Sequence, residues 1–268
     1  MNTTLEARRL CGGYGKAFTL QNADFVLPPG EITAVVGPNG SGKSTLLKLL
    51  GRLLRPVSGC VLLNGKEMST FGTKEIARHL AILPQLRQET GELLVSELVV
   101  YGRFPHRRPF CALSAKDQAA IQEAITLMEL EPLRRRPLSS LSGGERQRAW
   151  LAMTLAQESE ILLLDEPTTF LDIRCQLQIL ERIREWNRLR HTTILMVLHD
   201  LNQALHFSDH LLMLKEGKIL FSGRTAETLS AASIRSVFGI DVEFLSGSDG
   251  RAYCVAKGSA PAGGGRQE

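Results

Sequence analysis

Short, uninterrupted apolar runs separated by glycine-rich turns dominate the pattern of this chain. Glu31 to Val36 (EITAVV) is a β-branched apolar run that leads into a glycine-rich stretch, and Ser44 to Leu54 follows with a helix-forming composition. Ile161 to Leu164 and Thr193 to Leu198 are continuous apolar runs, as expected for strands of a parallel sheet covered on both faces. The pattern predicts a strand–loop–helix unit inside an α/β core.

Alternation and turn signals near the N-terminus predict a second kind of β-structure. Phe18 to Leu27 partly alternates polar with apolar residues, and Val61 to Leu63 runs into Asn64-Gly65, a strong hairpin turn. We therefore expect an antiparallel β lobe in this region.

The middle of the chain, from about 86 to 156, has helical patterning. Ser114-Ala115-Lys116-Asp117 resembles a capping box that opens a helix running to about Met128. The sequence thus predicts one domain, residues 1–257, whose core is formed by about 1–85 and 157–257 and is interrupted by a helical subdomain.

Towards the C-terminus the signals weaken. Leu211 to Leu214 and Lys218 to Phe221 flank Glu216-Gly217 and predict a closing hairpin. The stretch from about Gly239 has no pattern that we can interpret, and the composition of 258–268 predicts a disordered tail.

Composition narrows the class of protein. The 268 residues are 43% apolar, enough for a large core, and 32 basic and 28 acidic side chains leave a net charge of +4, which a polyphosphate ligand or an anionic surface would each explain. Five dispersed cysteines without a CxxC pair indicate a reduced, cytoplasmic setting. Apolar runs such as Ile194 to Leu198 are too short to span a bilayer, and no leader segment is recognisable, so we expect other chains to supply any membrane part.

The strongest chemical signal is a phosphate loop between the predicted strand and helix. It fits G-x-x-x-x-G-K-[ST] in full, with Gly37, Pro38, Asn39, Gly40, Ser41, Gly42, Lys43 and Ser44. Its backbone N–H groups can converge on phosphate oxygens, Lys43 adds charge at the β and γ phosphates, and Ser44 offers a hydroxyl to Mg²⁺. Thr45 can add a further phosphate contact.

Two carboxylates follow a buried apolar strand. Asp165 and Glu166 come directly after Ile161 to Leu164, beside the phosphate loop if the sheet is parallel. Asp165 would hold Mg²⁺ through water, and Glu166 could act as general base towards the attacking water. By themselves the two residues are also compatible with a solvated strand end.

A second anion site is predicted at a helix N-terminus. Ser142, Gly143, Gly144 and Glu145 stand before the helix-like stretch 146–157, and present backbone N–H groups and a hydroxyl. Taken alone, Ser142 is better explained as a simple helix N-cap after a turn.

The sequence Leu141-Ser142-Gly143-Gly144-Glu145 resembles the signature motif of the ATP-binding-cassette (ABC) ATPases, and the companion motifs occur in the family's order from about Leu10 to Gly223. The resemblance implies the P-loop ABC ATPase fold, with ATP and Mg²⁺ as cofactors. The residues it assigns are Tyr14 for adenine stacking, Gln85 for a Mg²⁺ contact, Phe170 to Asp172 for the loop at the dimer interface, and His199 for the γ-phosphate switch.

The resemblance also implies how two copies assemble. Two such subunits pack head to tail, so that Ser142 to Glu145 and Asp172 of one copy contact ATP on the phosphate loop of the other. Ser44, Gln85 and Asp165, the last through water, would hold Mg²⁺. Glu166 and His199 would be the catalytic residues. ATP closes the dimer and hydrolysis loosens it, because ATP binds preferentially to the closed state.

Two stretches are similar to the importer ATPases for iron(III)-siderophores, haem and cobalamin, the siderophore group above all: Tyr101 to His106 and Glu166 to Ile173. This branch implies a peripheral protein at the cytoplasmic face of the inner membrane, two integral permease subunits and, indirectly, a substrate-binding protein. Arg103 and His106 to Arg108 could equally be a solvated basic loop or a permease contact. We expect Arg134 to Arg136 to face solvent.

Rival functions are weaker. A nucleic-acid-binding protein would gather basic and aromatic residues on one face, whereas aromatic content is 6% and charge is dispersed, so no nucleic-acid partner is expected. A GTPase would need an Asn-Lys-x-Asp motif, which is absent from the sequence. The alternative that stays open is a cytosolic, non-transport ABC ATPase such as that of iron–sulfur cluster assembly.

Overall fold

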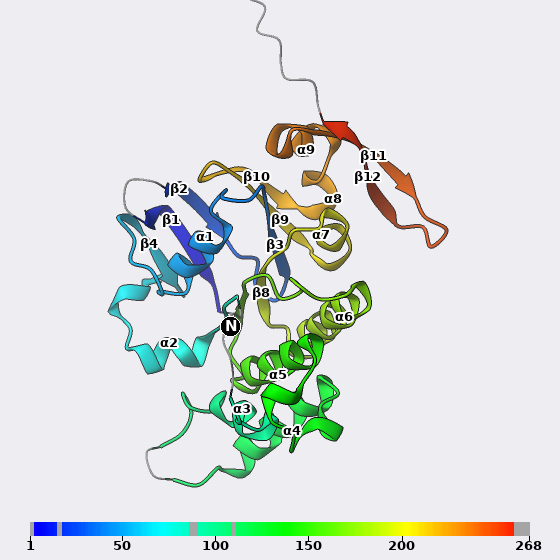
Figure 1. The fold of residues 1–268 in the computed structure, drawn as a ribbon. Helices are drawn as coiled ribbons and strands as arrows, with labels where there is room; N and C mark the ends of the chain where they lie inside the picture. Colours follow the sequence, from blue (N-terminus) through cyan, green and yellow to red (C-terminus); the bar gives the residue numbers. More distant parts are fainter. Residues whose placement is uncertain (1–2, 15–17, 86–90, 109–110, 260–268) are drawn as a thin grey trace, which may run out of the picture.

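A six-stranded mixed sheet forms the centre of the molecule (Figure 1). The computed structural model describes residues 3–14, 18–85, 91–108 and 111–259. Along the sheet the strand order is β10-β9-β3-β8-β7-β6, with β10 antiparallel to β9 and every other neighbouring pair parallel. The strands are β3 (Ile32–Val36), β6 (Leu80–Leu83), β7 (Ile161–Leu164), β8 (Thr193–Val197), β9 (His210–Lys215) and β10 (Lys218–Arg224).

Both faces of this sheet are covered, which explains the continuous apolar runs. In β7, Leu162 and Leu164 belong to a core cluster shared with the helical side, while Ile161 and Leu163 belong to a second cluster towards the N-terminal lobe. Every residue of β3, β7 and β8 is buried. Alternate side chains therefore point into two different cores, and neither face can be polar.

The predicted N-terminal β lobe is confirmed. A four-stranded antiparallel sheet has the order β2-β1-β4-β5 and consists of β1 (Leu5–Tyr14), β2 (Phe18–Val26), β4 (Ser58–Leu63) and β5 (Lys66–Glu67). Asn64 takes the left-handed conformation, φ 51°, at the predicted β4–β5 turn. The hairpin predicted around Glu216-Gly217 is also present, as β9 and β10.

Nine α-helices lie in the described residues, and three of them form the helical subdomain below the sheet in Figure 1. They are α1 (Lys43–Leu50), α2 (Thr73–His79), α3 (Val95–Tyr101), α4 (Ala115–Leu127), α5 (Gly143–Ala156), α6 (Ile173–Arg190), α7 (Leu201–Phe207), α8 (Thr225–Thr228) and α9 (Ala231–Phe238). The subdomain contains α3, α4 and α5, which pack on one another. The mixed sheet, β lobe and helical insert agree with the predicted fold class.

The start of α4 and the end of α1 can be compared with the boundaries predicted from the sequence. Ser114 caps α4 and exchanges hydrogen bonds with Asp117, so the predicted capping box is confirmed. The first helix ends at Leu50, four residues before the predicted end. Gly51 follows it, where a Cβ atom would lie 2.3 Å from Ile82 Cδ1, so any larger residue would require the Ile82 side chain to move.

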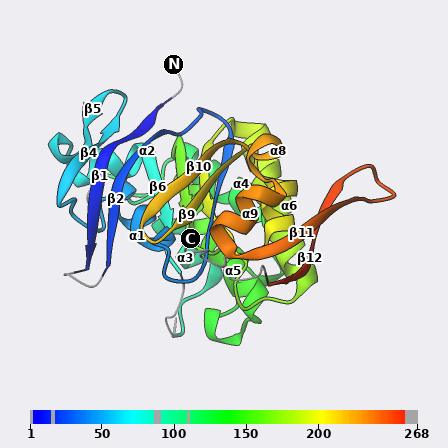
Figure 2. The same ribbon diagram turned by 90° about the horizontal axis from the view of Figure 1, so that it is seen from above.

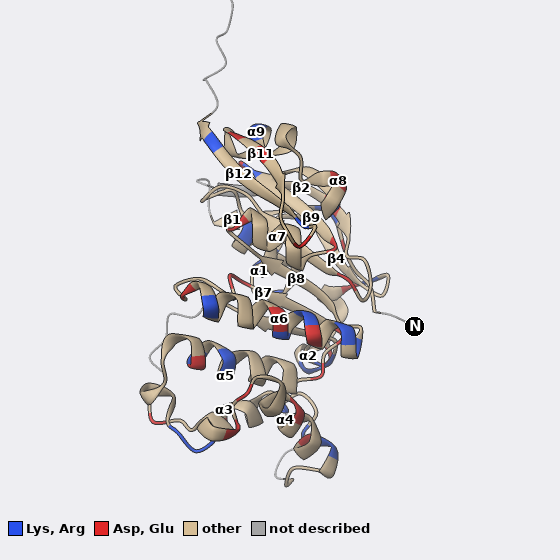
Figure 3. Cartoon of the chain, turned by 90° about the vertical axis from the view of Figure 1, so that its right-hand side faces the viewer, with Lys and Arg blue, Asp and Glu red and all other residues tan. Residues whose placement is uncertain are grey.

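Charged side chains are interspersed. Basic and acidic residues both occur on α4, α5 and α6 (Figure 3). Within the described ranges, no helix combines the length and apolar character needed to cross a lipid bilayer.

Arg103 corrects one prediction. Its side chain is only 1% exposed, so it belongs neither to a solvated loop nor to an accessible contact surface. The guanidinium donates to Asp117 Oδ1 at 2.8 Å, Ala156 O at 2.8 Å and Glu158 Oε2 at 2.9 Å. Burial by itself would raise the pKa of Asp117, but hydrogen bonds from Ser114 and Arg103 lower that pKa to about 2. Arg103 thus ties the end of α3 to α4 and to the α5–β7 connection.

The other basic residues are more accessible. His106 is half-buried, its Nε2 donates to Gln157 O at 2.8 Å, and burial lowers its pKa. Arg108, Arg135 and Arg136 are exposed, whereas Arg134 is half-buried and donates to Gln122. The expectation for 134–136 thus holds for two of its three residues.

A C-terminal hairpin was not foreseen. Strands β11 (Ile240–Ser246) and β12 (Ala252–Ser259) form a two-stranded antiparallel sheet that extends away from the body (Figure 2). Gly258 and Ser259 belong to β12, so the expected disordered tail does not begin at 258. Its remaining part, 260–268, lies outside the described residues.

We expect Arg103→Met to lower the free energy of unfolding by about 3–5 kcal/mol, because the substitution leaves Asp117 buried without its cation. Urea denaturation followed by circular dichroism measures this. Arg135→Met, at an exposed site in the same subdomain, is the matched control and should change the free energy by less than about 0.5 kcal/mol. Equal, small effects of both variants would show that the Arg103 cluster does not stabilise the subdomain.

Candidate functional site

The phosphate loop lies between the carboxyl end of β3 and the N-terminus of α1. A Cβ atom on Gly37 would lie 2.2 Å from Leu214 O, so the loop can approach β9 only with glycine there. Gly42 caps α1 with φ 107°, which also favours glycine. The sequence therefore folds into a loop whose backbone N–H groups precede a helix, which is the geometry that binds phosphate.

The other loop residues line the same turn. Pro38 O accepts from Ser41 N at 3.2 Å, while Asn39 and Gly40 are exposed. Ser41 Oγ is buried and has no hydrogen-bond partner within the described part of the chain. Thr45, on the first turn of α1, is 8% exposed. A buried hydroxyl without a partner is costly, and an incoming phosphate oxygen would satisfy it.

Lys43 is held inside the loop. Its Nζ donates to Gly37 O at 2.9 Å and to Pro38 O at 3.0 Å, and the residue is 5% exposed. Burial lowers the pKa of Lys43, and the nearby Glu166 and Asp165 carboxylates partly oppose the shift. The loop carbonyls thus hold the ammonium group inside the phosphate loop.

The loop and the strand β7 meet at Ser44 and Asp165. Ser44 Oγ donates to Asp165 Oδ1 at 3.0 Å, across 121 positions of sequence. Asp165 is buried, and burial raises its pKa, while the Ser44 hydrogen bond and the cations Lys48 and Lys43 act in the opposite direction. Two of the three side chains predicted to contact Mg²⁺, Ser44 and Asp165, therefore lie together.

The carboxylate of Glu166 contacts side chains from three segments of the chain. Its Oε2 accepts from Gln85 Nε2 at 2.7 Å and from Thr169 Oγ1 at 3.0 Å, and its Oε1 lies 2.6 Å from His199 Nε2. The backbone of Glu166 is left-handed, φ 53°, which is strained for a side chain of this kind and is typical of functional sites. Thr169 was missed by sequence reasoning, although its position three residues after Glu166 in a turn is a usable signal.

Tyr14 stands apart at the end of β1. Its side chain is 56% exposed, and Lys48 Nζ lies 5.5 Å from the ring centroid. The ammonium group of Lys48 therefore makes a cation–π contact with the Tyr14 ring. The ring is accessible for the stacking role that the family resemblance implies, and Lys48, on α1, had been given no role.

The signature residues lie in a different hollow from the phosphate loop. Ser142 caps α5, its N–H and Oγ both reach Glu145 Oε2, and these hydrogen bonds lower the pKa of Glu145. Asp172 caps α6 by accepting from Cys175 N at 2.9 Å. The hollow measures about 460 Å³ and its lining includes Ser142, Gly144, Glu145, Arg148, Asp172 and Arg174. No phosphate-loop residue lines it, so the chain does not bring its two predicted anion sites together.

The N-cap interpretation of Ser142 is confirmed, and Asp172 likewise caps a helix. A Cβ atom on Gly143 would lie 3.6 Å from Leu171 Cδ2, and one on Gly144 would lie 2.9 Å from Cys175 Sγ. The start of α5 is therefore packed against the loop that precedes α6 and its first turn.

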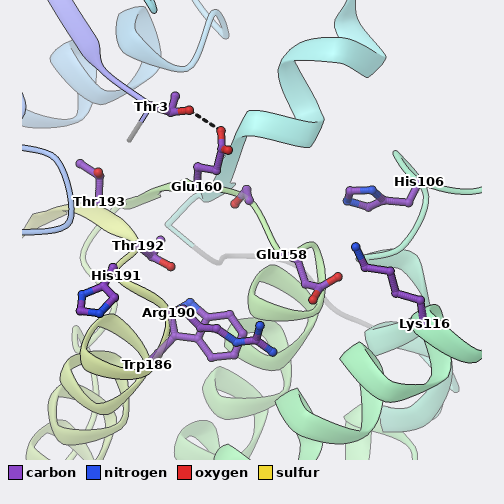
Figure 4. Close-up of a pocket in the computed structure, with 11 residues that line it drawn as sticks. Thr3, His106, Lys116, Glu158, Glu160, Trp186, Arg190, His191, Thr192 and Thr193 are labelled. Atoms are coloured by element: carbon purple, nitrogen blue, oxygen red, sulfur yellow. Dashed lines mark hydrogen bonds between the residues drawn. The ribbon is translucent and has the colours of Figure 1, made fainter. Parts of the chain in front are cut away.

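Another pocket, of about 360 Å³, lies between the helical subdomain and the core (Figure 4). His106 and Lys116 lie on one side of it, and Arg190 and His191 on the other. None of the residues assigned to nucleotide from the sequence lines this pocket. It is therefore separate from the candidate site.

The geometry can be compared with known proteins. A sequence model of the family described as "ABC transporter" matches residues 20–169. The chain is 45% identical to the petrobactin import ATP-binding protein FpuC of Bacillus anthracis, over 88% of this chain and 87% of that protein. It is 43% identical to the ferric enterobactin transport ATP-binding protein FepC of Escherichia coli (strain K12), with coverage of 88% and 87%.

One solved structure shows a comparable fold in a nucleotide-bound dimer. The ATP-binding cassette MJ0796, in a dimeric post-hydrolysis state with ADP and Pi, superposes with a TM-score of 0.69 at 25% identity. The superposition covers 82% of this chain and 98% of that chain.

We expect Lys43→Ala to weaken ATP binding by about 1.5–3 kcal/mol, because the variant loses a charge-assisted contact to phosphate. Isothermal titration calorimetry measures the change. Lys66→Ala, at an exposed position in β5, removes the same charge away from the loop and should bind ATP like the parent. Unchanged affinity of Lys43→Ala would contradict the phosphate-loop assignment.

Proposed function

Because this chain belongs to the ABC transporter family of ATP-binding proteins and hydrolyses ATP, we propose that it powers the import of an iron(III)-siderophore across a membrane. The cargo class is inferred from the similarity of this chain to the petrobactin import and ferric enterobactin transport proteins. The sequences are 43–45% identical over most of the chain. The alternative, an ATPase of iron–sulfur cluster assembly, is not favoured because those relatives are transport proteins.

The contacts around Glu166 suggest a separate role in ATP hydrolysis for each of its neighbours. Incoming phosphates would replace Gly37 O and Pro38 O as partners of Lys43. A γ-phosphate oxygen would likewise compete with Glu166 for His199. Release of His199 would free Oε1 of Glu166 to accept a proton from the attacking water, while Gln85 and Thr169 keep Oε2 in place.

The donor set at the phosphate loop fits Mg²⁺. Ser44 Oγ and Asp165 Oδ1 are hard oxygen ligands that already lie together, and Gln85 carries a further amide oxygen beside Glu166. Within the described residues no cluster of three His, Cys, Asp or Glu side chains is found, which suits an ion that takes few protein ligands besides phosphate. When bound, Mg²⁺ would neutralise charge on the β and γ phosphates.

We propose a head-to-tail dimer as the active form. The hollow around Ser142 contains Arg148 and Arg174, and its Ser142 hydroxyl and α5 N-terminus suit an anion. Since no phosphate-loop residue of the same chain reaches it, its anion would come from ATP bound to a second copy. Asp172, exposed at the start of α6, would lie at the same interface.

The permease subunits are proposed to contact the loop that follows α3. Tyr101 is 58% and Phe104 72% exposed, and the buried Arg103 between them fixes their backbone. Exposed aromatic side chains on a rigid support suit a protein contact. His106 to Arg108 lie next to this patch and would be accessible to the same partner. We therefore propose that the chain is a peripheral protein at the cytoplasmic face of the membrane.

We predict that Glu166→Gln keeps ATP affinity but lowers kcat by about 10²–10⁴, since an amide cannot accept the proton from water. With turnover blocked, ATP should hold two copies together, and light scattering should report the dimer. Glu227→Gln, at an exposed position of α8, is the control and should leave both readouts unchanged. Hydrolysis near the parent rate would remove Glu166 as the base.

Import itself is tested in cells that lack the chromosomal copy of this chain. Restoring the parent chain should restore uptake of siderophore-bound radioactive iron, whereas Glu166→Gln should not, because import needs turnover. Uptake that is independent of the chain would reject the transport function. A loss of iron–sulfur enzyme activity with intact uptake would instead favour the cytosolic alternative.

A further inference from the structure

The C-terminal hairpin holds the helix that follows His199. On α7, Asn202 Nδ2 donates to Cys254 O at 3.1 Å, and Asn202 Oδ1 accepts from Cys254 N at 2.7 Å. One turn later His206 Nε2 donates to Ala252 O at 2.8 Å. The His206 ring also meets Tyr253 edge to face, with centroids 4.7 Å apart. Three hydrogen bonds and one aromatic contact thus join α7 to β12.

The spacing of the two elements explains this fit. Asn202 and His206 are four residues apart and share one face of α7, about 6 Å apart along the axis. Ala252 and Cys254 are two residues apart and direct their backbone groups to the same edge of β12, about 6.6 Å apart. The helix face therefore covers the strand edge that β11 leaves unpaired, and Asn202 acts as a substitute for a strand neighbour.

Little chain separates this attachment from the catalytic site. His199 directly precedes Asp200, which caps α7 by accepting from Gln203 N at 2.9 Å. An adjacent side of α7 is fixed as well, since Gln203 Nε2 donates to Gln176 Oε1 at 2.6 Å on α6. A shift of α7 would move Asp200 and with it His199, whose ring faces Glu166 at 2.6 Å.

We propose that the β11–β12 hairpin is a positioning element for His199, and that Asn202 and His206 are the positioning residues through which it acts. The proposal rests on the proposed role of His199 in hydrolysis. The hairpin lies outside the residues matched by the family model, and its place on α7 gives the last part of the chain a function in turnover.

The test is a double-mutant cycle on the full chain. Asn202→Leu preserves side-chain size and removes both hydrogen bonds to Cys254, and we expect it to lower kcat about tenfold with KM for ATP unchanged. His206→Phe keeps a ring against Tyr253 but loses the bond to Ala252, and should lower kcat less. Val255→Thr, an exposed position of β12, is the matched control and should behave like the parent.

The cycle is completed in a His199→Ala background. If the hairpin acts through His199, Asn202→Leu should cause no further loss of kcat in that background. Losses that multiply in the double variant, or a parent-like kcat for both Asn202→Leu and His206→Phe, would overturn the positioning role while leaving the ATPase assignment intact. A parent-like kcat for His199→Ala itself would instead reject the role of His199 in the proposed function, and the positioning role with it.

Discussion

The carboxylate of Glu166 is the constraint on which the rest of the site depends. Its two oxygens are shared by Gln85, Thr169 and His199, which come from the ends of three neighbouring parallel strands. Only a parallel order of β6, β7 and β8 brings those ends to one edge, and β3 delivers the phosphate loop beside them. The sheet is buried on both faces, by the helical side on one face and by α1 together with the β lobe on the other. The apolar runs and the position of the site at the strand ends both follow from this arrangement.

The polar residues around this edge fall into two groups. The first would contact phosphate, and the second fixes the position of the segments that carry the first. Lys43 and Ser44 are proposed to belong to the first group. Arg103, buried among carboxylates and a carbonyl, belongs to the second, because it keeps the loop after α3 in register with α4 and the core. Asn202 is assigned the same kind of role for α7. We propose that Arg103 and Asn202 both act at a distance from ATP, because their side chains fix the position of the backbone.

Sequence patterns predicted the parts of the fold that local signals specify. The α/β core, the Asn64-Gly65 turn and the Ser114 capping box each follow from a few adjacent residues, and all are present.

Arg103 was misjudged because its partners, Asp117 and Glu158, are 14 and 55 positions away, and composition makes a basic stretch look solvated. The C-terminal hairpin escaped detection because its strands are half-exposed and its support comes from α7, which no local pattern reveals. The phosphate loop, Asp165 and Glu166 are brought together as expected, whereas Ser142 lies in a separate hollow, and we propose that its ligand is bound to another copy.

The central claim is that the phosphate loop of one copy is completed by Ser142 of another. Complementation between two inactive chains tests it most directly: Lys43→Ala disables the loop, and Ser142→Arg blocks the anion site by bulk. In a head-to-tail dimer, a mixed pair contains one intact site, formed by the loop of the Ser142→Arg chain and the signature residues of the Lys43→Ala chain. The account predicts that mixing the two chains restores ATP hydrolysis that neither has alone. A mixture no more active than its separate components would contradict a site shared between copies.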